Sequence, residues 1–476
     1  MVFSSPIFLF IFLPAVLYLA AVTPKGARNF LLLVASLIFY AWGEPRFLGV
    51  MLVSIAANYG LGLWVGRTRD GRNAKLIVAL AVCLNLGLLG VFKYAKFVVA
   101  NLNDLLATAG VAPFSLPDVA LPLGISFFTF HALSYVIDIY RRAAEPQRNP
   151  INFALYISFF PQLIAGPIIR YHDIATQLTE RVVTRDGFAV GVRRFVVGLA
   201  KKVLIANVLA VPADAVFALP NDQLTAGLSW LGIACYTLQI YFDFSGYSDM
   251  AIGLARMFGF RFLENFNYPY ISQSITEFWR RWHISLSNWY RDYLYIPLGG
   301  NRRSPWRTYV NLITVFFLCG LWHGASWSFV VWGMFHGAFL VLERIGLGRW
   351  LEARRQLVRH AYAVLVVMIG WVFFRSLTLT DAAAYLLAMA GFGHGAGIEY
   401  HVWLYLDHAV LLALGVGAIG SAPVLRWIDG WLERLPQPAS VLAIATAQIG
   451  GVVLLFALSL MRLSAGTYNP FIYFRF

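Results

Sequence analysis

Apolar segments long enough to cross a lipid bilayer recur along the whole of this 476-residue chain. Hydrophobic residues make up 59% of the sequence and charged residues only 13%, whereas charged residues are about 25% of a typical soluble domain. The segments expected to span lie near 3–22, 29–43, 47–66, 76–97, 119–140, 203–219, 224–242, 361–375, 408–424 and 439–460. The sequence therefore predicts an all-α polytopic integral membrane protein. One domain over residues 1–476 is expected, with about ten to eleven transmembrane helices plus re-entrant and interfacial helices.

The basic residues lie in alternate loops. Lys and Arg together number 37 against 23 for Asp and Glu, an excess that by itself would fit nucleic-acid binding. However, residues 97–140, 203–255 and 376–407 contain neither Lys nor Arg, and the basic groups lie between them. Because loops rich in Lys and Arg stay in the cytoplasm, this pattern indicates membrane topology. The lipid bilayer is the expected partner, and nucleic acid is not.

One apolar run, residues 309–344, is too long for a single straight crossing. Arginines precede and follow it, so both of its ends are expected in the cytoplasm. The segment must therefore enter the membrane and return, and the small residues of 320–326 are where the helix is expected to break. This break would place His323 deep in the bilayer, between Trp322 and Gly324.

A histidine at that depth has two interpretations. An ionisable side chain inside a membrane is costly and by default marks a functional site, but a lone histidine in an apolar helix can also be a packing residue that donates to a backbone carbonyl. Cys319 stands one helical turn before His323, so the two could form a thiol and imidazole pair, or the small cysteine could simply pack. His336, near the returning end, has a weaker case for function.

Residues 150–170 combine apolar side chains with Pro161, Gly166 and Pro167. Each proline removes a backbone donor and clashes with the preceding turn, so a continuous helix is not expected. Irregular backbone at membrane depth survives only inside protein or beside a wet cavity. The segment, which includes Gln162, is therefore predicted to be a second re-entrant element; an ordinary span kinked by proline is the alternative.

Two carboxylates, Asp243 and Asp249, lie in a run of aromatic and small residues. Paired carboxylates suggest acid and base chemistry, but positions with this separation lie on different faces of a helix. We expect them to orient other polar groups or to cap a broken helix.

Residues 270–298 have the pattern of an amphipathic helix. Ser274 and Glu277 have the spacing of a capping box, which predicts that the helix starts there. Aromatic and aliphatic residues recur on one face and basic residues occupy others, as in a helix that lies in the membrane surface. His283 falls on this helix and needs no chemistry if the helix is only interfacial.

Neither a disulfide nor a metal site is predicted. The three cysteines, Cys83, Cys235 and Cys319, all lie in apolar segments, which gives no disulfide framework. The loop at 376–407 carries His, Asp and Glu side chains that could bind a metal, but their spacing matches no fixed ligand pattern.

Several motifs stand in one order along nearly the whole chain. They are Pro-Gln-Leu-Ile-Ala-Gly-Pro at 161–167, Tyr241 to Gly253, Phe278 to Leu286, Tyr293 to Asn301, Trp322-His323-Gly324 and the terminal Asn469 to Phe474. Together they resemble the membrane-bound O-acyltransferase family, and in particular its bacterial polysaccharide branch. The resemblance implies a tunnel through the membrane that joins a cytoplasmic donor pocket to an extracytoplasmic acceptor site.

In that family a histidine lies in the tunnel, and His323 matches it. His283 matches the family's second polar position, where an orienting or donor-binding residue is expected. The resemblance implies acetyl-CoA as the donor substrate, no permanently bound cofactor, and acetylation of an exported polysaccharide such as alginate. It also implies a periplasmic SGNH-type acetyltransferase or relay protein as partner, and a place in the bacterial inner membrane.

The chemistry expected of such a site is acyl transfer to a hydroxyl group. A neutral imidazole can take the hydroxyl proton at neutral pH, and backbone amides freed at the break could stabilise the oxyanion. Four cytoplasmic arginines could hold the phosphates of coenzyme A or could mark topology alone; they are Arg280, Arg281, Arg302 and Arg303. The residues expected to line or support the tunnel are Trp322, Gly324, Asp243, Asp249, Gln162 and Cys319.

Two other classes of function remain open on the sequence. A channel or secondary transporter could move a carrier-linked acyl or sugar group without its own acyl-transfer chemistry, since broken helices also mark transporter binding sites. Against it, no inverted repeat is visible and intramembrane charge is sparse. A scaffold for a periplasmic acyltransferase is the third class, and it would not need His323.

Overall fold

The computed structural model describes residues 1–68, 71–117, 120–424 and 439–466. These residues form helices joined by turns and contain no strand, which confirms the all-α prediction. The terminal motif at 469–474 lies outside the described residues.

The chain divides into two compact units. Unit 1 comprises Met1–Val192 and Ala251–Leu263, and unit 2 comprises Arg193–Met250 and Glu264–Phe476. Whether the two units together form the single domain predicted over residues 1–476 depends on how they associate. The one-domain assignment therefore stays a prediction.

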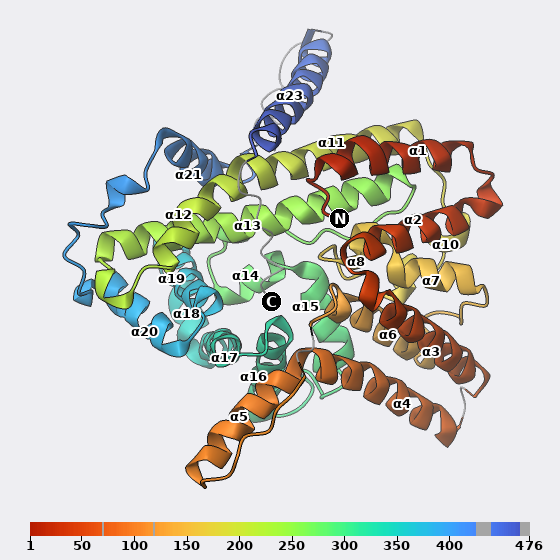
Figure 1. The fold of residues 1–476 in the computed structure, drawn as a ribbon, viewed down its shortest axis with the longest axis horizontal. Helices are drawn as coiled ribbons and strands as arrows, with labels where there is room; N and C mark the ends of the chain where they lie inside the picture. Colours follow the sequence, from red (N-terminus) through yellow and green to blue (C-terminus); the bar gives the residue numbers. More distant parts are fainter. Residues whose placement is uncertain (69–70, 118–119, 425–438, 467–476) are drawn as a thin grey trace. The chain divides into compact units, whose positions relative to one another are not determined.

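Unit 1 contains the helices drawn from red to yellow in Figure 1. The elements are η1 (Phe8–Phe12), α1 (Leu13–Val22), α2 (Arg28–Gly43), α3 (Leu48–Arg67), α4 (Arg72–Leu89), η4 (Gly90–Tyr94), α5 (Ala95–Thr108), α6 (Ile125–Tyr140), α7 (Pro150–Ser158), α8 (Phe160–Leu163), α9 (Tyr171–Ile174) and α10 (Gln177–Glu180). Two longer helices, α11 (Arg185–Ala200) and α13 (Ala226–Met257), contribute residues to both units.

Helix α6 forms the centre of unit 1. Nearly all of its side chains are buried, and it packs against α3 and α4. The contact with α3 depends on Gly62, because a Cβ there would overlap the Tyr135 ring. Helix α6 is thus covered by protein on all sides, and it begins six residues after the start of the predicted span at 119–140.

The fourth predicted span, 76–97, is part of a longer helix. Helices α4, η4 and α5 run without interruption from Arg72 to Thr108, so the helix continues beyond the predicted end of the span at residue 97. Lys93 lies within this run, and its ammonium donates to the Ser126 hydroxyl of α6 at 3.4 Å. The polar contact gives this lysine a partner inside unit 1.

The proline-rich segment of 150–170 is broken as predicted. Asn149 caps α7 by accepting from the Ile151 amide, and α7 ends at Ser158. Phe159 leaves the helical region at φ −54°, ψ 112°, and α8 follows for a single turn with Pro161 in its first turn, where a missing N–H costs nothing. No helix forms from Ile164 to Arg170. Whether the segment is re-entrant in a membrane stays a prediction.

Unit 2 contains the helices drawn from green to blue in Figure 1. The elements are η5 (Lys201–Ala206), α12 (Asn207–Phe217), α14 (Ile275–Arg281), α15 (Ile284–Tyr290), η8 (Arg291–Tyr295), α16 (Pro305–His323), α17 (Trp327–Leu342), η9 (Glu343–Leu347), α18 (Gly348–Glu352), α19 (Gln356–Arg375), α20 (Leu379–Leu387), η10 (Ala388–Phe392), α21 (His408–Gly420) and α23 (Ala439–Ser464), together with most of α13.

The segments predicted as spans at 203–219 and 224–242 both lie in helices, and both helices are longer than expected. The first runs through α11, η5 and α12 from Arg185 to Phe217, and the second is the 32-residue α13. Within unit 2 the two backbones meet closely, because a Cβ at Gly198 would lie 2.5 Å from the Gly246 carbonyl oxygen. Helix α13 is continuous through Asp243 and Asp249, so the prediction that these residues cap a broken helix is wrong.

The amphipathic segment starts where predicted but is not one helix. Ser274 is the N-cap of α14 and accepts from the Glu277 amide at 3.0 Å. The helix then ends at Arg281, and α15 begins after His283, whose backbone is left-handed at φ 44°, ψ 55°. The apolar stripe is buried in protein. The prediction of a continuous surface helix is therefore wrong.

The hairpin predicted over 309–344 is confirmed. Helix α16 ends at His323, Gly324 is extended at φ −164°, ψ 150°, and α17 starts at Trp327. The two helices lie side by side (Figure 1). A Cβ at Gly320 would overlap the Phe329 carbonyl oxygen, and a Cβ at Gly333 would overlap the Phe316 carbonyl oxygen. Glycine at both positions allows this close approach.

Length and composition mark seven candidate membrane spans in the described part of the chain. They are Lys25–Gly43, Pro45–Arg67, Arg72–Thr108, Arg185–Phe217, Trp327–Glu352, Gln356–Arg375 and Ile444–Ser464, and four shorter apolar helices accompany them, at Phe8–Val22, Ile125–Tyr140, Leu379–Phe392 and His408–Gly420. The chain is thus a multi-pass membrane protein. The exact total of ten to eleven spans and the central tunnel stay predictions.

Candidate active site

His323 is buried at the end of α16, where the hairpin turns. Only 6% of the residue is exposed. Its ring meets the edge or face of three aromatic side chains, with ring centroids 4.9 Å from Trp322, 4.9 Å from Trp332 and 5.2 Å from Phe374. These rings come from α16, α17 and α19, so three helices fix the imidazole. Gly324 is required beside it, because a Cβ there would overlap the Phe329 ring.

His283 lies in the same unit against the same indole. The Trp322 ring centroid is 6.3 Å from the His283 ring and 4.9 Å from the His323 ring. On its other side His283 meets Phe244 of α13 edge to face at 4.6 Å. The left-handed backbone of His283 turns the chain between α14 and α15. The structure therefore brings together two histidines that are forty residues apart in the sequence.

Asn265 holds His283 in place. The Asn265 side-chain oxygen lies 3.2 Å from the Ser285 amide nitrogen, 2.9 Å from the Ser285 hydroxyl and 3.0 Å from Nδ1 of His283. Because a backbone N–H can only donate, the atom it meets must be the amide oxygen. The Asn265 nitrogen donates to the Ser248 hydroxyl of α13 at 3.1 Å, so both ends of the amide are engaged.

These contacts fix the tautomer of His283. An amide oxygen only accepts, so Nδ1 of His283 must carry the ring proton. Helices α14 and α15 are not among the candidate spans, and burial lowers the pKa of His283 to about 3, so the ring is neutral at pH 7. Its Nε2 then presents a lone pair, and within the described part of the chain this buried atom has no hydrogen-bond partner.

The two carboxylates of α13 are paired with cations. Asp243 lies 2.7 Å from Lys202, and both side chains are almost fully buried. Asp249 lies 2.7 Å from both Arg194 and Lys201, and Arg194 also contacts Glu264. Because each carboxylate has a cationic partner, the arrangement supports the interpretation that they orient other polar groups rather than act as an acid and base pair.

A sequence model of the membrane-bound O-acyltransferase family matches residues 89–380. The chain belongs to this family. It is 45% identical to the probable alginate O-acetylase AlgI of Azotobacter vinelandii and 46% identical to that of Pseudomonas putida, over 100% of both chains in each case. It is also 35% identical to the peptidoglycan O-acetyltransferase of Helicobacter pylori, over 82% of this chain and 80% of the relative.

Membership confirms that the protein is a membrane O-acyltransferase, as the motifs predicted. It decides against the channel or transporter without acyl-transfer chemistry, and against the pure scaffold. All the residues of the described site that surround His283 and His323 fall within the matched region.

The four arginines expected to bind coenzyme A do not share one environment. Arg281 is engaged within its own segment, since it lies 2.8 Å from Glu277 and donates to the Asn267 carbonyl at 3.0 Å. Arg280, Arg302 and Arg303 are exposed, and their guanidinium groups make no ion pair with any described residue. Phosphate binding by these three stays a prediction.

The other supporting residues lie as follows. Cys319 is buried in α16, one turn before His323, and is a free thiol. Gln162 belongs to unit 1, where it is fully buried and its side-chain nitrogen donates to the Tyr156 carbonyl at 2.5 Å. Among the described residues no group of three or more His, Cys, Asp or Glu could hold a metal.

Sequence reasoning missed Asn265, Trp332 and Trp371. Asn265 lies in an irregular segment between two helices, where an asparagine carries no pattern of its own. The ring centroids of Trp332 and Trp371 lie 6.2 Å apart, and the Trp332 ring contacts His323. In the sequence, however, they are two of 15 tryptophans. Only the packing of α17 on α19 distinguishes them.

Proposed function

We propose that this enzyme takes an acetyl group from a cytoplasmic donor, acetyl-CoA, and passes it across the bacterial cytoplasmic membrane for O-acetylation of an exported polysaccharide. Alginate is the polymer we propose, because relatives that match over their full length are named as probable alginate O-acetylases. A periplasmic acetyltransferase or relay protein would complete the transfer to the sugar.

The observation that carries the proposal is the placement of two buried histidines against the Trp322 indole. Acyl transfer to a hydroxyl needs a base for the hydroxyl proton and groups that orient the hydroxyl. His323, at the turn of the hairpin, is proposed as the base. His283 presents an unpartnered Nε2 lone pair and is proposed to accept a hydrogen bond from the acceptor hydroxyl.

In the proposed reaction the acceptor oxygen attacks the thioester carbonyl as His323 takes its proton. The tetrahedral intermediate carries a negative oxygen, which needs N–H donors. The Gly324 amide is not one of them, because it already donates to the Gly320 carbonyl. The amides of Ala325 and Ser326 make no hydrogen bond with described residues and are proposed as the donors. Collapse of the intermediate breaks the carbon–sulfur bond, and the thiolate of coenzyme A leaves and takes the proton from His323.

Reconstitution tests this proposal. The purified protein in liposomes, supplied with acetyl-CoA labelled in the acetyl group, is expected to release free coenzyme A thiol and to label an added acceptor. Alginate oligosaccharides, with and without the periplasmic acetyltransferase, would identify the acceptor. No thiol release from acetyl-CoA under any of these conditions would rule out the proposed donor, and labelling of another polymer in preference to alginate would rule out the proposed acceptor.

A further inference from the structure

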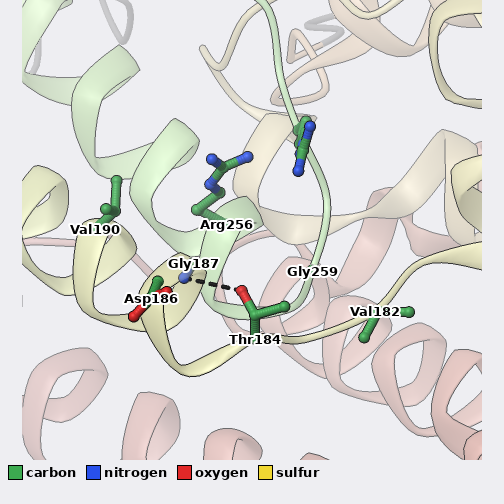
Figure 2. A pocket seen from close by; sticks show the side chains of 8 residues that line it. Val182, Thr184, Asp186, Gly187, Val190, Arg256 and Gly259 are labelled. Atoms are coloured by element: carbon green, nitrogen blue, oxygen red, sulfur yellow. Dashed lines mark hydrogen bonds between the residues drawn. The ribbon is translucent and has the colours of Figure 1, made fainter.

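A recess of about 250 Å³ opens in unit 1 beside the first turn of α11 (Figure 2). Because a water molecule occupies about 30 Å³ in the liquid, this volume holds several waters or a group the size of a phosphate ester. The lining residues are Val182, Thr184, Asp186, Gly187, Val190, Arg256, Gly259 and Arg261.

The recess carries a net positive charge. Arg256 is half-buried at the end of α13 and Arg261 follows in the next segment. Neither guanidinium makes an ion pair or hydrogen bond with a described residue. Asp186 supplies the single carboxylate among the lining residues. Two arginines that face one recess without a protein partner are suited to a bidentate anion such as phosphate.

The first turn of α11 adds donors to the same recess. Thr184 caps the helix, because its hydroxyl accepts from the Gly187 amide at 3.0 Å (Figure 2). Its carbonyl accepts from the Phe188 amide at 2.9 Å. The amides of Arg185 and Asp186 have no partner within the helix. The positive end of the helix dipole therefore points toward the space that the arginines line.

The wall that carries the arginines is anchored in the unit. The Arg181 guanidinium donates to the Phe258 carbonyl at 3.2 Å and stacks on the Phe260 ring at 4.1 Å. The Gln177 side-chain oxygen accepts from the Arg261 amide at 2.7 Å. Gly259 has φ +85°, and a Cβ there would lie 3.1 Å from the Val183 side chain. The recess is thus held in shape by contacts that do not involve a ligand.

The rim of the recess is apolar and exposed. Of the lining residues, Val182 is 68% exposed and Val190 is 42% exposed, and their sequence neighbours Val183 and Phe188 are 43% and 37% exposed. Apolar side chains beside arginines are typical of a protein surface at the lipid headgroups, where the apolar groups enter the acyl boundary and the arginines reach the phosphates. The basic residues from Arg181 to Lys202 place this end of α11 on the expected cytoplasmic side.

We propose that this recess is a phosphate site, and that its occupant is the headgroup of an anionic phospholipid of the cytoplasmic leaflet. Arg256 and Arg261 hold the phosphate, the first-turn amides of α11 approach it from the opposite wall, and the acyl chains pass over the apolar rim. The phosphates of coenzyme A share this chemistry and are the other source, which the experiment separates.

The test compares two double variants of the full-length protein in detergent. Arg256→Gln/Arg261→Gln removes both guanidinium groups of the recess, whereas Arg72→Gln/Lys75→Gln removes two exposed charges of unit 1 that do not line it. Binding of phosphatidylglycerol and of phosphatidylcholine is measured by native mass spectrometry, and binding of coenzyme A by calorimetry. Size-exclusion profiles verify that both variants remain folded.

The recess variant is expected to bind phosphatidylglycerol about thirtyfold more weakly than the wild type, while the control variant and the binding of phosphatidylcholine change little. Coenzyme A binding should be unchanged. Loss of coenzyme A binding with phosphatidylglycerol binding intact would assign the recess to the donor and overturn the lipid proposal. Equal losses in the two variants, or no loss in either, would show that the recess is no phosphate site.

Discussion

Replacing Asn265 with leucine is expected to lower acyl transfer about five- to 150-fold. The change leaves the Nδ1 proton of His283 without the acceptor that it has at 3.0 Å, in a site where His283 is 1% exposed. An unsatisfied buried donor costs about 1–3 kcal/mol, which corresponds to this range in rate. Moving the proton to Nε2 does not remove the cost, because Nε2 has no hydrogen-bond partner among the described residues either, and it would then no longer accept from the acceptor hydroxyl.

Asn265→Asp separates this positioning role from a structural one. The carboxylate keeps an acceptor for His283 and Ser285, and its charge raises the pKa of His283. Because the neutral ring is the active form, the acid limb of the pH–rate profile should move to higher pH, with activity recovering at alkaline pH. Asn267→Leu is the matched control, since Asn267 is exposed and its side chain makes no hydrogen bond with a described residue. Full activity in Asn265→Leu, or an unshifted profile in Asn265→Asp, would refute the reasoning.

Two further predictions concern stability. Gly333→Ala should lower the melting temperature in detergent markedly, because its Cβ would overlap the Phe316 carbonyl oxygen, whereas Gly415→Ala, inside helix α21 and with open space at its Cβ, should change it little; equal melting temperatures would contradict the packing argument. The hydrogen bond to Asp138 raises the pKa of His172, so the stability from this contact is present below pH of about 6.5 and is lost as the pH rises through the raised pKa; His172→Gln should abolish that part of the pH dependence, and an unchanged dependence would argue against it.

The hairpin of α16 and α17 could be predicted because its signals are local. The run from 309 to 344 is too long for one crossing, arginines flank it, and small residues from Gly320 to Ser326 mark the turn. The break after Ser158 could be predicted equally well, because a proline disrupts the helix at its own position. These features need no knowledge of the rest of the chain.

The break at His283 could not be predicted in this way. Apolar residues recur at helical spacing over 274–293, both before and after His283. No proline or glycine in this stretch indicates that the helix ends. The helix stops because Asn265 supplies acceptors to the Ile284 and Ser285 amides through its backbone and side-chain oxygens. The same holds for Asp243, whose role depends on Lys202 in another helix. Contacts between segments distant in the sequence determine both the break at His283 and the role of Asp243. The periodicity of apolar residues does not report such contacts.

The role of His323 is tested most directly by acetyl transfer from labelled acetyl-CoA in purified, reconstituted protein. His323→Ala is expected to lower the rate about 10²- to 10⁴-fold, the usual effect of a general base, with an unchanged size-exclusion profile. His336→Leu is the matched control, because His336 is a fully buried histidine of the same hairpin that also packs on Trp332. This variant should keep most of the activity. Wild-type rates in His323→Ala, or equal losses in the two variants, would contradict the account.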